Sequence, residues 1–400
     1  MAERGIYVHV PFCLAKCAYC SFNSYPVPGG VPDYYVAALL QDAAVESEGW
    51  REAESKSEAA FDTVYLGGGT PSLLGAGQLA AILASLRAGL RIRPGAEITV
   101  ECNPATAGQA ELEAFRELGV SRLSVGVQSL AERELRVLGR LHSADQALGA
   151  LDLARQAGFD DVSADVMLGI PGQTNDTIRS TLEGVSRGAG HVSAYMLSVE
   201  DGTPMAEMVS RQELVPVEDD AVADQYQLAD RVLGRLGFER YEISNWSLPG
   251  RRCRHNEIYW GRGDYVGVGA GAHSHVRGVR WSKIGDPRRY AEALAVGGDA
   301  VDFREVLTRD QRLLEDVMLG LRTDRGLDLD RLASAYGVET GPLAAVAERL
   351  AGDGRVVRKG NSLTLSTKGA LLHEAISTEF AAALSGPKPM RSKGRRRPCR

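Results

Sequence analysis

The sequence lacks any long uninterrupted apolar run, although 44% of its 400 residues are hydrophobic. A membrane-spanning helix needs roughly 18 apolar residues in a row, so the chain is expected to be soluble. The first residues, MAERGIYVHVPFC, also lack the apolar core of a signal peptide and the Arg-rich, acid-poor composition of a transit peptide. These absences predict a cytoplasmic protein.

Basic residues are scarce in the body of the chain. The first 385 residues carry 39 Lys and Arg against 52 Asp and Glu, a net charge of −13, which argues against a nucleic-acid partner. Residues 386–400, GPKPMRSKGRRRPCR, hold seven Lys and Arg and no acid. We expect residues 381–400 to form a basic disordered tail, which either solubilises the chain or contacts anionic lipid or RNA.

Cysteine is sparse as well, with six residues in the chain, but three of them form Cys13-x-x-x-Cys17-x-x-Cys20. In a reducing compartment this spacing indicates metal ligands rather than disulfides. Three thiolates on one loop can hold three irons of a [4Fe-4S] cluster and leave the fourth iron open. The alternative is structural zinc, which needs a fourth ligand such as Cys102, Cys253 or His255.

Short β-rich runs alternate with segments of helical period over the first 200 residues. The predicted strands are 6–10, 63–66, 97–101, 122–127, 161–167 and 191–197, and the predicted helices are 33–50, 78–86, 108–118, 131–139, 144–156 and 176–187. This alternation is typical of parallel βα units. Polar residues that directly follow the strands favour a barrel or partial barrel over a doubly wound open sheet.

The regular alternation ends after residue 200. We expect residues 201–307 to be a connecting extension that completes the core. Residues 308–380 show three helical segments and two short strands around Gly360-Asn361, an order that resembles a winged helix. Its third helix, PLAAVAERL, carries one Arg and one Glu, which favours packing or a protein partner over DNA binding.

Seven short segments resemble the radical S-adenosylmethionine (SAM) superfamily and, within it, the coproporphyrinogen III oxidase-like family. They are IYVHVPFC (6–13), GGGTP (67–71), ECNP (101–104), SVGVQS (124–129), GRLH (139–142), DVMLGIPGQT (165–174) and HNEIYW (255–260). The resemblance implies an α/β fold, a partial (β/α)6 TIM-like barrel with a mainly helical, winged-helix-like C-terminal domain.

The resemblance also implies the cofactors. In that superfamily the open iron of the [4Fe-4S] cluster is chelated by SAM, and an electron from the cluster cleaves the sulfonium to give a 5'-deoxyadenosyl radical. Arg140 suits the SAM carboxylate, whereas the acids suit ribose hydroxyls or the ammonium group. The alternative for any one of these residues is a polar strand end that caps the next helix. The residues implied to bind SAM are Tyr7, Phe22, Gly68, Gly69, Thr70, Glu101, Gln128, Arg140 and Asp165.

Residue 22 separates two subgroups of this family. The coproporphyrinogen dehydrogenases carry a fourth cysteine there and a longer N-terminal extension, whereas this chain has Phe22 and twelve residues before Cys13. Both differences resemble the HemW haem chaperones, as does the HNxxYW pattern. We expect His255, Tyr259 and Trp260 of that pattern to contact haem, with His9, His273 and His275 as weaker candidate ligands. The alternative is a hydrogen-bonded structural histidine among core aromatic residues.

The resemblance predicts a haem chaperone that delivers haem to apo-haemoproteins and has no catalytic residue of its own. The principal alternative is an enzyme, an oxygen-independent coproporphyrinogen III oxidase. A zinc-stabilised interaction protein is a third hypothesis. The sequence leaves open the cluster reductant and the oligomeric state, a homodimer included.

Overall fold

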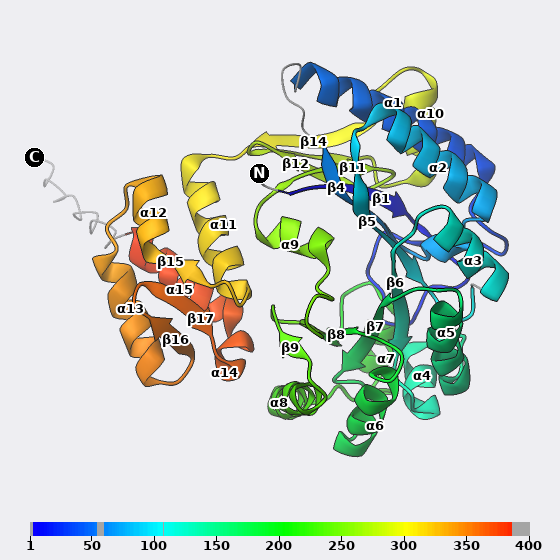
Figure 1. The fold of residues 1–400 in the computed structure, drawn as a ribbon. Helices are drawn as coiled ribbons and strands as arrows, with labels where there is room; N and C mark the ends of the chain where they lie inside the picture. Colours follow the sequence, from blue (N-terminus) through cyan, green and yellow to red (C-terminus); the bar gives the residue numbers. More distant parts are fainter. Residues whose placement is uncertain (1–2, 54–59, 107, 386–400) are drawn as a thin grey trace, which may run out of the picture. The chain divides into compact units, whose positions relative to one another are not determined.

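The computed structural model describes residues 3–53, 60–106 and 108–385 (Figure 1). The chain divides into two compact units, the first ending at Thr308 and the second beginning at Arg309. In the part of the chain that is described, every helix is too short or too polar to span a lipid bilayer.

The first unit contains strands, helices and one 3-10 helix, η1. In chain order they are β1 (Arg4–Val10), β2 (Phe12–Cys13), β3 (Tyr25–Pro26), α1 (Asp33–Ala53), β4 (Phe61–Gly68), η1 (Pro71–Leu73), α2 (Ala76–Gly89), β5 (Ile92–Cys102), α3 (Gln109–Glu117), β6 (Arg122–Gln128), α4 (Glu132–Leu138), α5 (Ala144–Gln156), β7 (Asp161–Leu168), α6 (Asn175–Val185), β8 (His191–Met196), α7 (Pro204–Ser210), α8 (Asp219–Arg235), β9 (Glu239–Arg240), β10 (Asn245–Ser247), α9 (Arg254–Trp260), β11 (Asp264–Val268), β12 (His273–Val276), β13 (Val279–Lys283), α10 (Pro287–Ala295) and β14 (Val301–Val306).

These strands build one open twelve-stranded sheet in the order β14-β13-β12-β11-β1-β4-β5-β6-β7-β8-β10-β9. The run from β1 to β8 is parallel and follows chain order, as crossover helices between successive strands require. The six predicted strands and the six predicted helices are all confirmed, and so is the partial barrel.

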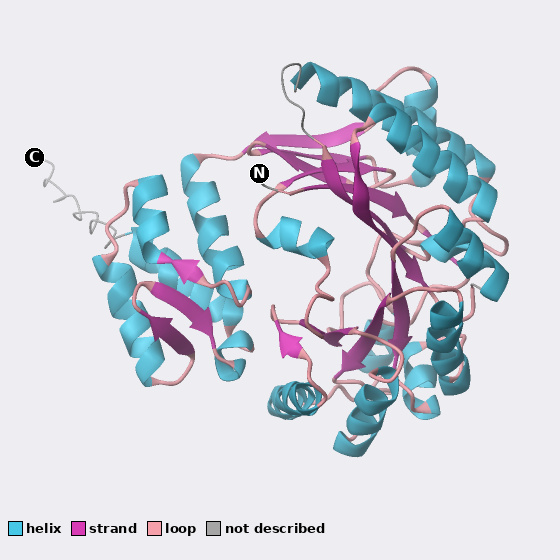
Figure 2. Cartoon of the chain, in the orientation of Figure 1, coloured by secondary structure: helices cyan, strands magenta, loops and turns pink. Residues whose placement is uncertain are grey.

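The strands of the parallel run segregate their side chains by face. On β6, Leu123, Val125 and Val127 are buried against the helices, whereas Arg122 and Ser124 point to the opposite face. Helices α1 to α6 lie on the outer side of the curved sheet (Figures 1 and 2). The inner side therefore carries the polar residues of each strand.

The extension adds strands to both edges of the sheet. On one side β11 pairs in parallel with β1 and continues into the antiparallel strands β12, β13 and β14. On the other side β10 pairs antiparallel with β8. The segment 201–307 is thus part of the sheet that carries the parallel strands.

The second unit has the predicted winged-helix-like order. It contains α11 (Arg309–Arg322), β15 (Leu327–Asp328), α12 (Leu329–Tyr336), α13 (Gly341–Gly352), β16 (Val356–Lys359), β17 (Ser362–Leu365), α14 (Thr367–Ala370) and α15 (His373–Ser385), with a three-stranded sheet ordered β15-β17-β16. The prediction that the tail begins at residue 381 is wrong, because α15 continues to Ser385 and buries Ile376 and Phe380 in the core of the unit. Residues 386–400, the basic segment, lie outside the described residues.

A buried ion-pair cluster fastens the extension to α1. Lys283 Nζ on β13 lies 2.8 Å from Asp42 Oδ1 and 2.6 Å from Glu46 Oε1, and it donates a 2.8 Å hydrogen bond to Asp299 O. Tyr290 on α10 donates a 2.7 Å hydrogen bond to Asp42 Oδ2. Because the side chains of Lys283 and Asp42 are fully buried, each charge depends on the other for compensation.

We predict that Lys283→Met lowers the unfolding free energy of the first unit by about 3–5 kcal/mol, because it leaves two buried carboxylates without a cation. All four tryptophans precede residue 309, so their fluorescence during urea unfolding reports on the first unit. Lys359→Met in the second unit is the control. A Lys283→Met midpoint equal to that of the wild type would contradict the role of this cluster.

Candidate functional site

The first unit contains a cavity of about 490 Å³ on the inner face of the parallel strands. It reaches from the segments that follow the strands at their carboxyl ends down to Arg122 and His191, which begin β6 and β8. In α/β barrels, ligands bind at this end of the strands. The cavity is therefore the candidate site.

Eleven of the fifteen residues predicted from the sequence line this cavity, namely Cys13, Cys17, Cys20, Phe22, Gly68, Gly69, Thr70, Glu101, Gln128, Arg140 and Asp165. Tyr7, His255, Tyr259 and Trp260 are not among its lining residues. The fold thus brings the three cysteines and most of the residues expected to bind SAM into one cavity.

The loop that carries the cysteines is held from several sides. Its two ends pair as the short parallel strands β2 and β3. Midway, Ala18 N donates to Leu138 O at the end of α4 (3.1 Å), and Met205 N in α7 donates to Ala18 O (2.8 Å). A segment without regular structure is thereby fixed at the rim of the cavity.

Asn23 joins this loop to the extension. Its side-chain nitrogen donates to Ala270 O (3.2 Å) and to Gly285 O (3.0 Å). Its own carbonyl oxygen lies 3.0 Å from Nε2 of His9 on β1. One asparagine therefore ties the cysteine loop to β1 and to a segment some 250 residues later in the chain, a role the sequence did not suggest.

The two glycines at the end of β4, Gly68 and Gly69, are required by the protein's own packing. Gly68 has φ +117°, and a Cβ there would lie 2.5 Å from the His9 ring. A Cβ on Gly69 would lie 2.6 Å from Phe12 O. Only glycine lets β4 end this close to the start of the cysteine loop.

Three carboxylates line the cavity, Glu101, Asp165 and Glu200, and burial shifts the pKa of the first two. Glu101 accepts hydrogen bonds from Tyr65 OH (2.8 Å) and Gly68 N (3.0 Å), and Asp165 Oδ1 accepts one from Ser124 Oγ (3.3 Å). Burial raises the pKa of Glu101 to about 7, and burial also raises the pKa of Asp165. Both carboxyls are therefore poised to respond to a charged ligand.

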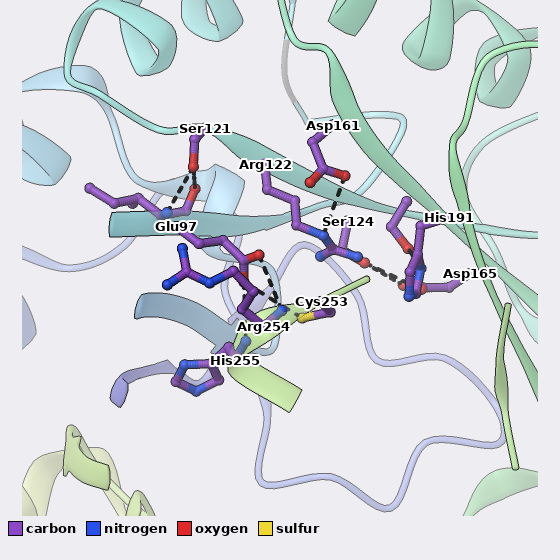
Figure 3. A network of polar contacts seen from close by, with 12 residues as sticks. Glu97, Ser121, Arg122, Ser124, Asp161, Asp165, His191, Cys253, Arg254 and His255 are labelled. Carbon is purple, nitrogen blue, oxygen red and sulfur yellow. Dashed lines mark hydrogen bonds and ion pairs between the residues drawn. The ribbon is translucent and has the colours of Figure 1, made fainter. Parts of the chain in front are cut away.

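A buried arginine stands below these acids. The Arg122 side chain is 2% exposed, and its Nε lies 3.7 Å from Asp161 Oδ1. Nearby, Glu97 accepts hydrogen bonds from the backbone N–H groups of Arg254 (3.2 Å) and His255 (3.1 Å). Figure 3 shows Arg122 and these acidic side chains on the same side of the sheet.

Sequence reasoning missed Arg122, Tyr65, Ser193 and Asn256, which also line the cavity. A signal was present, because the residues at alternate positions of β6 are polar or glycine, namely Arg122, Ser124, Gly126 and Gln128, although the strand is largely buried. A parallel strand covered by helices is usually apolar throughout. Such alternation therefore indicates an inner face that serves a ligand.

Known proteins resemble this chain over most of its length. Residues 7–185 match the Radical SAM superfamily, and residues 307–372 match the HemN C-terminal domain. The chain is 40% identical over 377 residues to the haem chaperone HemW of Mycobacterium tuberculosis, covering 93% of each chain. It is 30% identical over 384 residues to HemW of Bacillus subtilis, covering 95% of this chain and 100% of that one. The chain belongs to the HemW family.

A solved structure shares the fold. Coproporphyrinogen III oxidase (HemN) from Escherichia coli superposes with a TM-score of 0.82 over 96% of this chain and 91% of that chain, at 22% identity. At this identity the likeness shows the fold and not the reaction. Membership of the HemW family and of the radical SAM superfamily implies a [4Fe-4S] cluster and SAM.

The cysteine sulfurs suit a cluster facing the cavity. Thr70 Oγ1 donates to Cys13 Sγ at 3.4 Å, and Arg140 Nη1 donates to Cys17 Sγ at 3.3 Å. Donors of this kind stabilise thiolates that ligate iron. All three sulfur-bearing residues line the same cavity, so this family's cluster fits the residues present.

The proposed fourth ligands of a zinc site are engaged elsewhere. The Cys102 thiol contacts Asn103 O at 3.6 Å, and the buried Cys253 thiol contacts Glu97 Oε1 at 3.9 Å. His255 has both ring nitrogens hydrogen-bonded, Nδ1 to Thr63 Oγ1 and Nε2 to Tyr259 OH. The zinc hypothesis finds no support in this arrangement.

Buried polar atoms in the cavity wall suit a polar cofactor. Gln128 Oε1 and Arg140 Nε are buried and have no hydrogen-bond partner within the described residues. Gln128 also has φ +66°, a strained left-handed conformation at the end of β6. A bound molecule could satisfy both atoms if a hydroxyl group donated to Gln128 Oε1 and a carboxylate accepted from Arg140 Nε. SAM has both kinds of group.

Within the HNxxYW motif, Asn256 lines the cavity, whereas His255, Tyr259 and Trp260 are not among its lining residues. His255 is completely buried, its Nδ1 lies 2.7 Å from Thr63 Oγ1, and its Nε2 lies 2.8 Å from Tyr259 OH. Burial and then the charge of Arg122 lower the pKa of His255 to about 3, so the ring is neutral. Contact of this imidazole with a haem iron requires one of these two hydrogen bonds to break.

The other residues outside the cavity pack against aromatic rings. Tyr7 bonds His9 Nδ1 through its hydroxyl (2.8 Å), and its ring stacks on Tyr65 at 6.3 Å. Trp260 packs against Tyr241, with ring centroids 5.8 Å apart. Tyr7 therefore supports the cavity wall from behind in this structure.

Asn23→Ala is predicted to weaken retention of the cluster. The variant removes two hydrogen bonds that fix the cysteine loop, so chelator-induced iron loss from the reconstituted protein should be several-fold faster, since each net bond contributes about 1 kcal/mol. Asn361→Ala, which removes a similar bond in the second unit, is the control. Equal rates of iron loss in the two variants would contradict the anchoring role of Asn23.

SAM affinity should depend on the ionisation of Glu101. Because its pKa is raised to about 7, the carboxylate form disappears as the pH falls from about 8 to about 6, and SAM binding to the reconstituted wild type should weaken over that range. Glu101→Gln should bind SAM about ten- to a hundredfold more weakly and show no such slope. Isothermal titration measures both.

The folded protein should show the opposite trend in the absence of SAM. A folded pKa above the unfolded value of 4.5 means that ionising Glu101 costs stability, which declines as the pH rises towards 7. Glu101→Gln should remove this decline, and the substitution of an exposed residue, Glu113→Gln, should not.

For the binding prediction, a wild-type SAM affinity that does not change with pH would show that Glu101 is not the carboxylate that binds SAM.

Proposed function

We propose that this protein is a haem chaperone that binds a [4Fe-4S] cluster, SAM and haem, and delivers haem to apo-haemoproteins. Two observations support this function over catalysis. The relatives matched over nearly the whole chain are named haem chaperones. Phe22 occupies the position at which the resemblance to the dehydrogenases would require a cysteine.

Phe22 gives that position a different chemistry. Its ring is 68% exposed and lines the cavity at the cysteine loop. A thiol there could donate a hydrogen atom or bind metal, whereas a phenyl ring can do neither. It offers apolar surface, which a flat macrocycle can cover.

The residues of the chain have separate tasks in this proposal. Cys13, Cys17 and Cys20 would hold three irons of the cluster, which supplies one-electron chemistry when bound. Arg140 and Glu101 would orient SAM through its charged groups.

The choice of haem ligand rests on exposure. Among the candidate histidines, His9 and His255 are buried with both ring nitrogens bonded, and His275 is buried with Nδ1 bonded to Gly263 O. His273 on β12 is exposed. Exposure favours His273, whereas the motif resemblance favours His255, Tyr259 and Trp260.

Wild-type protein reconstituted with cluster and SAM should retain haem through gel filtration. It should make no protoporphyrinogen from coproporphyrinogen III, even with a strong reductant present, because the oxidase's cysteine is replaced by Phe22. Phe22→Cys should not create turnover, since one residue does not rebuild a substrate site. Many turnovers per wild-type protein would overturn the chaperone proposal.

His273→Ala and His255→Ala separate the two haem sites. If the exposed His273 is the haem ligand, His273→Ala should lose the ligand-specific haem absorption. His255→Ala should keep that absorption and mainly lower thermal stability. The reverse result would return the site to the HNxxYW motif. The half-buried His373 of the second unit supplies the control variant His373→Ala.

A further inference from the structure

Tyr65 lies between the HNxxYW motif and a carboxylate of the cavity. Its hydroxyl donates a 2.8 Å hydrogen bond to Glu101 Oε1. Its ring stacks on that of His255, with ring centroids 5.1 Å apart and an interplanar angle of 26°. Tyr65 lines the cavity, whereas His255 does not. The tyrosine therefore connects a buried histidine to a group expected to bind SAM.

The register of the strands explains how Tyr65 reaches Glu101. Tyr65 on β4 pairs with Thr99 on β5, so Glu101 lies two residues further along the same face of the sheet. Gly67 is the corresponding residue of β4. A Cβ on Gly67 would lie 2.8 Å from Tyr65 Cε1 and 3.0 Å from Glu101 Oε1. Glycine thus leaves open the space that the tyrosine ring needs to meet the carboxylate.

His255 is held by the same two strands. Its Nδ1 lies 2.7 Å from the hydroxyl of Thr63, two residues before Tyr65 on β4. Its backbone N–H donates a 3.1 Å hydrogen bond to Glu97 Oε1, four residues before Glu101 on β5 (Figure 3). The ring that packs on Tyr65 is therefore fixed by both strands that carry the tyrosine and the carboxylate.

The Tyr65 hydroxyl is a permanent donor to Glu101. Burial raises the pKa of Tyr65 well above its usual value, so the hydroxyl keeps its proton. The second oxygen of Glu101 accepts a 3.0 Å hydrogen bond from Gly68 N. A carboxylate that is held at both oxygens has a fixed orientation, and both hydrogen bonds favour its ionised form.

We propose that Tyr65 is a positioning residue, which orients Glu101 and favours its ionised form for SAM, and that His255 of the HNxxYW motif holds Tyr65 in place. This inference rests on the SAM site of the proposed function. It gives the motif a task at that site, whichever histidine binds haem. His255 does not have to touch SAM for this task, because it acts through Tyr65 and Glu101.

Several groups besides Tyr65 act on Glu101, and all of them remain in Tyr65→Phe. Burial raises the pKa of Glu101 most, and the Tyr65 hydrogen bond is the largest influence that lowers it. The charge of Asp165 raises this pKa, whereas the Gly68 N–H and the charge of Arg122 lower it. Loss of the Tyr65 hydroxyl should therefore raise the pKa of Glu101 by about one unit. The other titratable neighbours are hydroxyls whose own pKa values burial raises far above this range, namely those of Tyr7, Tyr195 and Tyr259.

The test compares the SAM affinity of wild type and Tyr65→Phe, both reconstituted with the cluster, by isothermal titration from about pH 6 to about pH 8.5. Phenylalanine keeps the ring that stacks on His255 and removes the hydroxyl alone. The ratio of the two dissociation constants at each pH cancels the titration of SAM itself. Tyr226→Phe is the matched control, because it removes a buried hydroxyl that donates to Ile243 O at 2.7 Å and does not line the cavity.

Tyr65→Phe should bind SAM about five- to tenfold more weakly than the wild type near pH 6, and less than about twofold more weakly near pH 8.5, where Glu101 ionises in both proteins. Without SAM, the decline of stability that accompanies ionisation of Glu101 should continue to a pH about one unit higher in this variant. A role of Tyr65 in packing alone predicts neither change. An affinity ratio that does not change with pH would overturn this inference alone, whereas a cluster-loaded wild type that binds no SAM would overturn the SAM assignment.

His255→Ala tests the second part of the inference. It should weaken SAM binding with the same dependence on pH, because Tyr65 loses the ring on which it packs. Thr63→Val, which removes the hydroxyl beside His255 Nδ1, is a milder variant and should act in the same direction. Combining Tyr65→Phe with His255→Ala should cost no more affinity than the larger of the two single effects, since both act through one hydroxyl. Effects that add would show that His255 does not act through Tyr65.

Discussion

The structure depends on one constraint, that charges buried on the inner face of the sheet must be compensated there. Arg122 supplies the cation among Asp161, Glu97 and Asp165. Removing one member of such a group leaves an uncompensated buried charge, which costs about 3–5 kcal/mol. Each charge buried on the inner face of the sheet therefore has to be compensated by an opposite charge from another strand or from a ligand in the cavity.

The same constraint explains why the cavity suits a cation. Burial is the main cause of the raised pKa of both Glu101 and Asp165, and the charge of Asp165 raises the pKa of Glu101 further. SAM carries a sulfonium and an ammonium group, so its entry offsets the cost of ionising these two acids. The raised pKa values of Glu101 and Asp165 and the preference for a cationic cofactor therefore have the same cause, the burial of these two carboxyls in the cavity wall.

Local patterns in the sequence were sufficient for much of the fold. The strands β1 and β4 to β8 follow from β-rich runs between helical segments, and in the second unit α11, α12, α13 and the hairpin of β16 and β17 were predicted, whereas β15, α14 and α15 were not. The placement of β11 beside β1 could not be predicted, because that pairing joins segments about 260 residues apart and has no local signature.

The site was predictable to the extent that motifs mark it. Cys13, Glu101 and Asp165 were found from their segments, whereas Arg122 and Asn23 act through partners that only the folded chain brings near. The HNxxYW motif shows the limit most clearly. Its spacing is consistent with a haem ligand, but the hydrogen bonds of His255 to Thr63 and Tyr259 depend on β4 and on the helix itself.

The extension has a direct part in the site as a consequence of this topology. A chain ending at residue 200 would keep all three cysteines and every residue expected to bind SAM. It would lose β11, which covers one edge of β1, and the carbonyls of Ala270 and Gly285 that hold Asn23. Since β1 leads straight into the cysteine loop, the edge and the loop would be released together. The cluster-binding loop is thus positioned by residues that follow it by some 250 positions, and the motif alone does not make the site.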